Sequence, residues 1–384
     1  MPIVAALVAP LAMTLGFFTS ASSEGSGDSK KKESSKSKKN GDNTTKTVRG
    51  TPIADPPPNI GRTKYTIVGD FLYWRADEDG LTYGLDVKGG TKAKALDPDF
   101  EWRPGYRAGA GFQFNRNDNW DMMFIWTGLN SHTKDHFVTD IDSLSDRLVA
   151  PRWSPEILGG TASSASLHWR LRYNTIDWYL GRDFFVGRQL TLHPIAGVRG
   201  AWISQKYDAH YLSQFVTSTQ PGPFSMPTSF DGNIDFKGVG MRAGFDLKYH
   251  VTKNFGFCGS LSGALFYGWT NLKERIKGFQ TPVSGDLVPE DLTYRHHFQG
   301  TRTNLEGGLG LLLEGDIRNS GPHITLTVKY EFSEWFNQNV LTDAVFVPNI
   351  VDAPTPTKFS TLRPDEQDKN LGLQGLTVEI RVDF

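Results

Sequence analysis

The last part of the chain, LQGLTVEIRVDF, alternates strictly between apolar and polar positions. Leu376, Val378, Ile380, Val382 and Phe384 share one parity, and the residues between them are Thr, Glu, Arg and Asp. A period of two residues is typical of a strand with one apolar face and one ionic face. The segment therefore predicts a β-strand that reaches residue 384.

The same alternation predicts strands at 105–114, 238–250 and 323–333. Two further segments are less regular. HWRLRYNTIDWYL, at 168–180, changes phase near Thr175, which predicts a bulge or a different boundary there. KYTIVGDFLYWRA, at 64–76, is almost apolar on both faces.

Short polar turns alternate with long polar loops along residues 62–384, and they separate strands of about 12–20 residues. The expected short turns are 115–119, 186–188, 251–254 and 317–322. The expected long loops are 77–100, 132–164, 208–231, 272–296 and 337–367. This layout predicts ten strands with both chain ends on the short-turn side, or twelve strands if LTYGLDV (81–87) adds a pair.

Apolar faces on so many strands need either a second layer in water or lipid around them. A mean hydropathy of −0.39 fits a membrane barrel, because only alternate residues face lipid. The aromatic content of 12% and the 40 glycines fit the same class. We therefore expect an all-β protein, an antiparallel transmembrane β-barrel.

The first part of the chain predicts export. Residues 1–22 contain an apolar run typical of a signal peptide, although no Lys or Arg precedes it. Residues 23–61 are rich in Ser, Lys and Pro and predict a disordered linker. Residues 62–384 form the predicted barrel. The net charge of −1 argues against a nucleic-acid partner, and the single Cys258 excludes an internal disulfide.

Five segments resemble, in their order, the pore-forming major-outer-membrane-protein-like family known from Legionella and environmental relatives of the chlamydiae. They are GDFLYWRADEDGLTYG, WRPGYRAGAGFQF, NWDMMFIWTGLNS, LHWRLRYNTIDWYLGRDFF and LTLHPIAGVRGAWISQKY. The resemblance covers about 63–384 and implies an outer-membrane β-barrel porin without catalytic residues. The single cysteine and the Ser/Lys-rich leader depart from the cysteine-rich chlamydial porins.

The resemblance implies the outer membrane of a Gram-negative-type envelope, with lipids and the barrel assembly machinery as partners. A terminal Phe384 after alternating apolar residues resembles the C-terminal insertion signal of such barrels. The last strand should close against the first. We expect passive diffusion of small hydrophilic solutes, and an oligomer is compatible with the sequence.

The candidate pore-lining residues have the inward parity of their strands. They are Arg107, Arg170, Arg172, Arg199, Arg242, Asp246, Arg302, Glu306, Lys329, Glu331, Glu379 and Arg381, with Asp70, Lys248 and Asp383 beside them. Nine cations against six carboxylates predict a weakly basic lumen that favours anionic solutes. The alternative is that these residues fill a narrow barrel as structural salt bridges.

Seven tryptophans lie near the predicted upper ends of strands, where an interfacial girdle is expected. They are Trp74, Trp102, Trp126, Trp169, Trp202, Trp269 and Trp335. A surface adhesin or structural barrel without a pore is an alternative function. An omptin-like protease is another, based on Asp140 and Asp142 and on Asp208 and His210. No motif for other catalysis is present, His296 and His297 are too few for a metal site, and no cofactor is expected.

Overall fold

The computed structural model describes residues 64–88, 92–114, 120–139, 147–153, 162–186, 189–215, 224–280, 288–317, 322–348, 360–366 and 369–384. The predicted signal peptide and linker lie outside these residues. The strands are β1 (Lys64–Glu78), β2 (Gly84–Lys88), β3 (Lys92–Leu96), β4 (Trp102–Phe114), β5 (Trp120–Val138), β6 (Arg147–Pro151), β7 (Ala162–Arg182), β8 (Phe184–Val186), β9 (Leu190–Phe215), β10 (Phe224–His250), β11 (Phe255–Gln280), β12 (Val288–Asp316), β13 (His323–Asn339), β14 (Thr342–Pro348), β15 (Ser360–Glu366) and β16 (Lys369–Asp383). Within these ranges, no helix has the length and apolar character needed to cross a bilayer.

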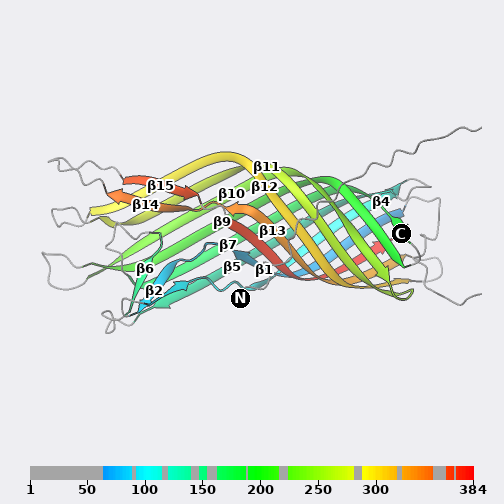
Figure 1. The fold of residues 1–384 in the computed structure, drawn as a ribbon, viewed down its shortest axis with the longest axis horizontal. Helices are drawn as coiled ribbons and strands as arrows, with labels where there is room; N and C mark the ends of the chain where they lie inside the picture. Colours follow the sequence, from blue (N-terminus) through cyan, green and yellow to red (C-terminus); the bar gives the residue numbers. More distant parts are fainter. Residues whose placement is uncertain are drawn as a thin grey trace, which may run out of the picture. The chain divides into compact units, whose positions relative to one another are not determined.

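Ten of these strands close into an antiparallel barrel, which confirms the predicted fold class (Figure 1). Around the ring they follow the order β1, β4, β5, β7, β9, β10, β11, β12, β13 and β16. The last strand pairs with the first from Thr66 and Asp383 to Glu78 and Leu371. The Phe384 amide also donates to the Tyr65 carbonyl oxygen at 2.9 Å. Closure leaves no open sheet edge, as a strand protein in lipid requires.

The remaining strands extend the connections at one end of the barrel or lengthen a turn. β2 pairs with β3 and β6, β14 pairs with β15, and the short β8 pairs with β9. The predicted extra pair at LTYGLDV is therefore part of this extension, and the ring has ten strands rather than twelve. β2, β6, β14 and β15 lie at the end opposite the C-terminus in Figure 1. Because long connections of such barrels are external, this is the outer end.

Two of the predicted long loops are wrong in extent. Residues 208–231 and 272–296 were expected as loops, but β9, β10, β11 and β12 run through most of them and reach 26, 27, 26 and 29 residues. These strands are longer than a bilayer requires, since about 9–11 tilted residues cross it. Their outer portions therefore continue beyond the membrane.

Along β7 the apolar side chains change from the outer to the inner face of the barrel, and this change explains the apparent phase change near Thr175. The pairing of β7 with β5 and with β9 passes through Thr175 without a shift, so the predicted bulge is absent there. On one side of Thr175 the outward residues are apolar, as at Trp178, and on the other side they are polar, as at Arg172. The two-residue period persists while the apolar side changes from outward to inward.

The outward side chains of the other strands in the ring also change from apolar to polar, and this change divides the barrel into two zones. In the part that we call the membrane zone, the outward residues are apolar. In the part beyond it, which we call the outer zone, the outward residues are polar. The membrane zone covers 65–73, 102–114, 120–126, 176–180, 190–202, 239–249, 255–269, 305–313, 324–332 and 376–384. On β10 the boundary lies between Lys237 and Val239, which are consecutive outward residues.

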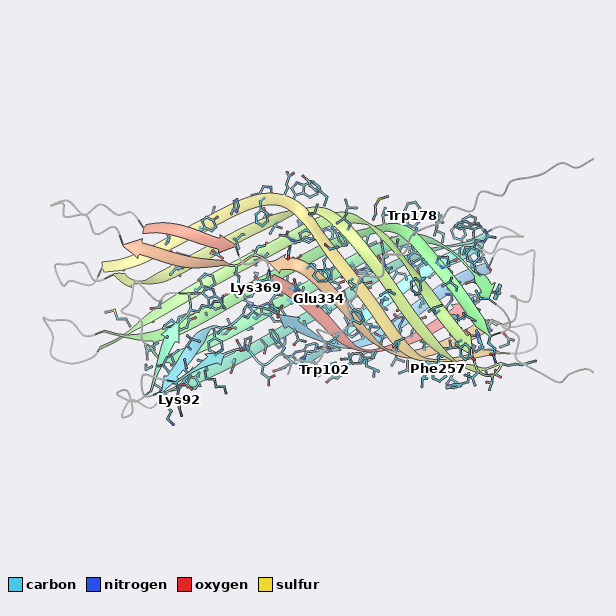
Figure 2. The ribbon with its side chains drawn as sticks, viewed as in Figure 1. Lys92, Trp102, Trp178, Phe257, Glu334 and Lys369 are labelled. Carbon is cyan, nitrogen blue, oxygen red and sulfur yellow. The ribbon has the colours of Figure 1, made fainter. Side chains whose placement is uncertain are left out.

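Four of the seven predicted girdle tryptophans lie on the outside of the barrel near this boundary. Trp102, Trp126, Trp202 and Trp269 are 39–43% exposed, and Trp178, which lies further into the membrane zone, also faces outward (Trp102 and Trp178 are labelled in Figure 2). The prediction is wrong for Trp74, Trp169 and Trp335, which point inward and are at most 4% exposed. The outer zone has an apolar interior that accommodates these three side chains.

A charge on the lipid-facing surface should destabilise the barrel in a position-dependent way. Leu309, on β12 in the middle of the membrane zone, is 76% exposed on the outward face. We expect Leu309→Arg to lower the free energy of unfolding by about 2–4 kcal/mol, because the guanidinium enters hydrocarbon. Urea unfolding in lipid vesicles measures this. Thr293→Arg, on the same face of β12 in the outer zone, is the control and should change stability little.

Candidate functional site

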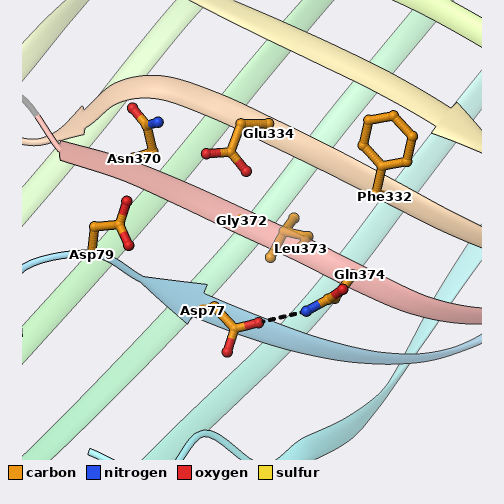
Figure 3. A pocket seen from close by; sticks show the side chains of 8 residues that line it. All are labelled: Asp77, Asp79, Phe332, Glu334, Asn370, Gly372, Leu373 and Gln374. Carbon is orange, nitrogen blue, oxygen red and sulfur yellow. Dashed lines mark hydrogen bonds between the residues drawn. The ribbon is translucent and has the colours of Figure 1, made fainter. Parts of the chain in front are cut away.

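A shallow depression lies on the outer surface, at the boundary between the two zones. Its volume is ≈ 210 Å³, and its lining includes Asp77 of β1, Asp79 directly after it, Glu334 of β13, and Gln374 of β16 (Figure 3). Gln374 donates to Asp77 at 3.0 Å. These side chains lie on the outer face of the barrel, so the lumen must be considered separately.

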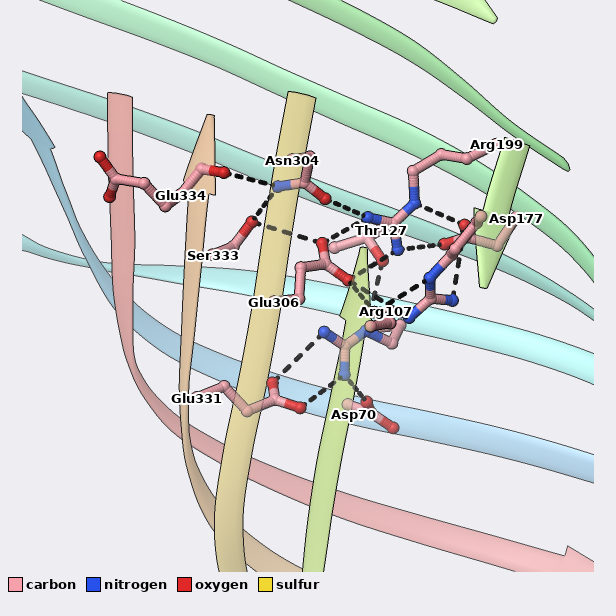
Figure 4. Close-up of polar contacts among 12 residues, drawn as sticks. Asp70, Arg107, Thr127, Asp177, Arg199, Asn304, Glu306, Glu331, Ser333 and Glu334 are labelled. Carbon is pink, nitrogen blue, oxygen red and sulfur yellow. Dashed lines mark hydrogen bonds and ion pairs between the residues drawn. The ribbon is translucent and has the colours of Figure 1, made fainter. Parts of the chain in front are cut away.

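Arg199 on β9 is the centre of an ion-pair group that crosses the lumen (Figure 4). Its Nε and Nη2 lie 2.5 and 2.9 Å from the two carboxylate oxygens of Asp177 on β7. Its Nη2 also donates to Glu306 on β12 at 2.9 Å, and its Nη1 donates to Asn304 at 2.8 Å. Arg242 on β10 donates to Glu306 at 3.2 Å. Because three strands of the ring separate β7 from β12, the group bridges nearly opposite walls.

A second group lies beside the first, around Arg107 of β4. Arg107 Nη1 is 2.8 Å from Asp70 of β1, and its Nη2 is 3.3 Å from Glu331 of β13. Lys329 Nζ lies 3.1 Å from Glu331 and 3.0 Å from Glu379 of β16. Two cations therefore bind three carboxylates at this level, and each carboxylate comes from a different strand.

Trp74 connects this ionic group to the outer zone. Its indole Nε1 donates to Thr377 Oγ1 at 3.1 Å, and Thr377 donates to Glu331 at 2.5 Å. The Arg107 guanidinium lies 5.7 Å from the centroid of the Trp74 ring, within range of a cation–π interaction. The ring of Trp74 thus contacts the charged layer directly, where the polar and apolar parts of the interior meet.

Further ion pairs fill the part of the membrane zone nearest the short turns. His193 Nε2 lies 2.7 Å from Asp121, and its Nδ1 lies 3.6 Å from Asp246. Lys248 and His250 lie 3.0 and 2.9 Å from Glu314. Arg381 lies 3.2 Å from Asp383, which also accepts a hydrogen bond from Thr66 at 2.5 Å. Charged pairs therefore continue from the middle of the membrane to its inner boundary.

The interior of the outer zone is a packed apolar core around Trp335. The indole ring of Trp335, on β13, lies 4.8 Å from Phe266 of β11, 5.9 Å from Tyr173 of β7 and 6.4 Å from Phe236 of β10, measured between ring centroids. All four side chains are at most 2% exposed. Since these strands lie on different sides of the ring, the core fills the barrel from wall to wall.

Elements outside the ring complete this core at the outer end. Trp153, which follows β6, stacks on Phe230 of β10 with ring centroids 5.0 Å apart. The Tyr211 hydroxyl donates to the carbonyl oxygen of Tyr83 at 2.6 Å. Burial raises the pKa of the Tyr83 hydroxyl, and the nearby carboxylate of Asp135 raises it further. The connections thus cover the open end of the barrel with buried aromatic side chains.

The structure places most of the predicted pore-lining residues on the inner face. Inward positions are occupied by Arg107, Arg199, Arg242, Asp246, Arg302, Glu306, Lys329, Glu331, Glu379 and Arg381. Arg170 and Arg172 are corrections, because both lie on the outer face of β7 in the outer zone. Their inward neighbours, Trp169 and Leu171, are buried. The predicted phase change at Thr175 assigned the wrong face to these two arginines.

The predicted weakly basic lumen is also wrong. Three inward carboxylates, Asp121, Asp177 and Glu314, were missed, and they pair with His193, Arg199 and Lys248. With these three added and the two arginines removed, the predicted set becomes seven Lys or Arg against nine carboxylates, and the inward Glu78 and Glu274 of the outer zone increase the excess of carboxylates. Asp177 could have been found from strand pairing, since it lies directly opposite Arg199 in the register of β7 and β9.

The residues considered for proteolysis do not form a shared site in the described part of the chain. Asp140 and Asp142 lie outside the described residues. Asp208 and His210 share the outward face of β9, and Asp208 is 2.7 Å from Arg170. No group of three or more His, Cys, Asp or Glu in the described ranges has an arrangement suited to a metal ion.

The closed ring of ten strands, its apolar outer band and its charged interior define an integral β-barrel protein of the outer membrane. Residues 59–384 match the family described as Legionella pneumophila major outer membrane protein precursor. The chain belongs to this family and is an outer-membrane protein. The resemblance inferred from the sequence is thereby confirmed.

Solved structures similar to this chain are other barrels of low similarity. The outer membrane protease OmpT from Escherichia coli has 10% identity and a TM-score of 0.34, covering 84% of this chain and 96% of that one. Ail, the attachment invasion locus protein of Yersinia pestis, has 11% identity and a TM-score of 0.23, covering 84% and 99%. The P. putida toluene transporter TodX has 9% identity and a TM-score of 0.29, covering 84% and 89%. No curated protein matches the chain. At these values the likenesses carry no argument about activity.

Proposed function

We propose that this protein is a closed barrel that presents its outer zone at the cell surface, and that it is not an open diffusion pore. One observation carries the proposal. The lumen is crossed twice, by the Arg199 ion-pair group in the membrane zone and by the Trp335 core in the outer zone. A hydrated path for solutes would have to displace both. The surface-adhesin or structural-barrel alternative derived from the sequence fits this interior.

Passive diffusion of small hydrophilic solutes is the second candidate function. The charged inner face of the membrane zone favours this candidate. The interior of the outer zone is filled with apolar side chains, so a lumen that served only as a packed core would not need these charges. In this candidate the ion pairs separate to admit ions. With carboxylates in the majority, such a pore would prefer cations, since charged residues set the selectivity of a pore.

Conductance across a planar bilayer separates the two candidates. We expect the refolded wild-type chain to give no discrete current steps, because both barriers remain in place. Steps with a cation-selective reversal potential across a salt gradient would establish the porin and contradict the closed barrel. Insertion should be verified independently, by protection of the barrel from added protease. This control distinguishes an inserted barrel that does not conduct from a bilayer that contains no protein.

The remaining proposed properties follow from the class of protein. We propose a non-catalytic role, with the outer-membrane lipids and the barrel assembly machinery as partners and with the apolar face of Leu376 to Phe384 as the recognised terminal strand. Leu376, Val378, Ile380 and Val382 face outward on β16, and the exposed Phe384 directly follows the strand. The side-chain positions of Asp208 and His210, on an open outer face rather than in a cleft, support the absence of catalysis.

A further inference from the structure

The outer faces of β5, β7 and β9 carry a concentration of Lys, Arg and His side chains in the outer zone. We call this the basic patch, and its members are His132, Lys134, His136, His168, Arg170, Arg172, Lys206 and His210. Asp208 is the carboxylate within it, and it lies 2.7 Å from Arg170 and 4.0 Å from His168. Four Lys or Arg side chains and four imidazoles therefore surround Asp208, and Glu101 lies at the edge of the patch, where it pairs with Arg103.

The strand register brings these side chains into adjacent rows. Arg170 of β7 lies directly between His132 of β5 and Lys206 of β9. In the next row, His168 lies between Lys134 and Asp208. Directly opposite residues in such pairs are about 5 Å apart at Cβ, so Arg170, Lys206 and the imidazoles beside them can reach one anionic group. Arg103, beside β5, adds its Nη2 at 2.9 Å from His132 Nε2.

The basic patch begins where the apolar band ends. Lys206 follows the exposed Trp202 by four residues on β9, which is about 13 Å along the strand and less in height because barrel strands are tilted. Polar headgroups occupy this layer, just outside the hydrocarbon. The long side chains of Arg170, Arg172 and Lys206 therefore lie at the depth of lipid headgroups, and Lys134 lies one row farther out.

The excess of positive charge lies on this side of the barrel, because the outward cations of β11, Lys273, Arg275 and Lys277, are accompanied by Asp231 and Asp291 on the neighbouring strands. On β10, next to β9, the outward residues include Asp231 and Asp235. On the far side, Asp77, Asp79 and Glu334 line the depression of Figure 3. Anionic groups at headgroup depth should therefore collect along β5, β7 and β9 and avoid the face formed by β13, β16 and β1.

We propose that the basic patch binds the phosphate groups of anionic lipids in the outer leaflet. Arginine matches phosphate with two parallel hydrogen bonds, and lysine adds compact positive charge. Arg172, Lys134 and Lys206 have no carboxylate within ion-pair distance among the described residues, so they are available for such a ligand. The site depends on the fold and its orientation, and not on whether the lumen conducts.

The test uses the full chain, folded in phosphatidylcholine vesicles that contain a small, fixed fraction of fluorescent lipid A carrying two phosphates. Energy transfer from the protein's tryptophans to this lipid reports its enrichment around the barrel. Lipid A with both phosphates removed is the parallel probe. We expect the wild type to enrich the phosphorylated lipid, and the variant Arg170→Gln/Arg172→Gln/Lys206→Gln to lose about 10- to 100-fold of the apparent affinity.

A matched variant removes the same charge elsewhere. Lys273→Gln/Arg275→Gln/Lys277→Gln changes three outward cations on β11, beyond Trp269, and should retain wild-type enrichment. Equal loss in both triple variants, or equal enrichment of the two lipids, would overturn the proposal. Retention of enrichment in the basic-patch variant would also overturn it, as would displacement of the lipid by millimolar inorganic phosphate, which would indicate a site for the free anion.

Folding of each variant is checked by its heat-dependent shift in gel mobility. If the triple variant does not fold, Arg172→Gln replaces it, since Arg172 is exposed and has no described ion-pair partner. This single change should reduce enrichment of the phosphorylated lipid several-fold. Unchanged enrichment in a folded Arg172→Gln protein would count against the proposal.

Discussion

Replacing Arg199 with methionine is expected to lower the free energy of unfolding of the barrel by about 3–5 kcal/mol. The side chain of Arg199 is 4% exposed and that of Asp177 is 3% exposed. Methionine keeps much of the volume but leaves the negative charges of Asp177 and Glu306 without their main partner in a layer shielded from water. Removing one partner of a buried pair is costly mainly because the other charge remains. Urea unfolding in vesicles, monitored by tryptophan fluorescence, gives the difference.

Two controls separate the buried charge from other effects of the substitution. Arg172→Met removes the same charge from the outer face of a neighbouring strand and should change stability by less than about 1 kcal/mol. Arg199→Met combined with Asp177→Asn and Glu306→Gln removes the whole group and should recover much of the loss, because no unpaired charge remains. A single Arg199→Met variant as stable as the wild type would mean that water reaches these carboxylates, which would favour the porin candidate.

The strand content could be read from the sequence because lipid outside and polar groups inside impose a two-residue period. β16 is the clearest case. The alternate apolar residues from Leu376 to Phe384 face outward, and Thr377, Glu379 and Arg381 between them face inward, as predicted. The turns were equally visible, as at 251–254 between β10 and β11. Both features depend on neighbouring residues in one strand, and neither needs knowledge of the distant chain.

The two-zone interior could not be read in the same way, because the rule linking polarity to direction changes along a single strand. On β7, Trp178 and Arg172 both face outward, the first toward lipid and the second toward water. If the whole length of β7 is assumed to be surrounded by lipid, Arg172 must be assigned to the inner face. The missed Asp177 has a similar cause, since its partner Arg199 is 22 residues away and meets it only through strand pairing.

The reversal of polarity is itself the signal that sequence analysis can use. β10 passes from outward Asp231, Asn233, Asp235 and Lys237 to outward Val239 and Met241 without a break in its period. Applied to every strand, such a reversal marks where the membrane ends and assigns Trp74, Trp169 and Trp335 to the interior. The reversal also accounts for strand lengths of 26–29 residues, because a strand whose outward face becomes polar can continue beyond the membrane surface.

Replacing Trp335 with alanine should test whether the outer zone is stabilised by its interior. Trp335 is fully buried between Tyr173, Phe236 and Phe266, so its removal leaves a cavity that rigid strands cannot close. We expect a loss of about 3–5 kcal/mol in the free energy of unfolding, as for other buried aromatic side chains. The measurement is urea unfolding in vesicles, as for Arg199.

Trp178→Ala is the matched control, because Trp178 is 49% exposed on the outside of the barrel and its loss creates no interior cavity. Its effect should be clearly smaller than that of Trp335→Ala. The pair also bears on the function. If Trp335→Ala destabilises the protein yet the folded fraction gives no current steps, the Arg199 group is sufficient to close the lumen. If current steps appear in Trp335→Ala alone, the aromatic core is the barrier, and the charged membrane zone beneath it is already a path for ions.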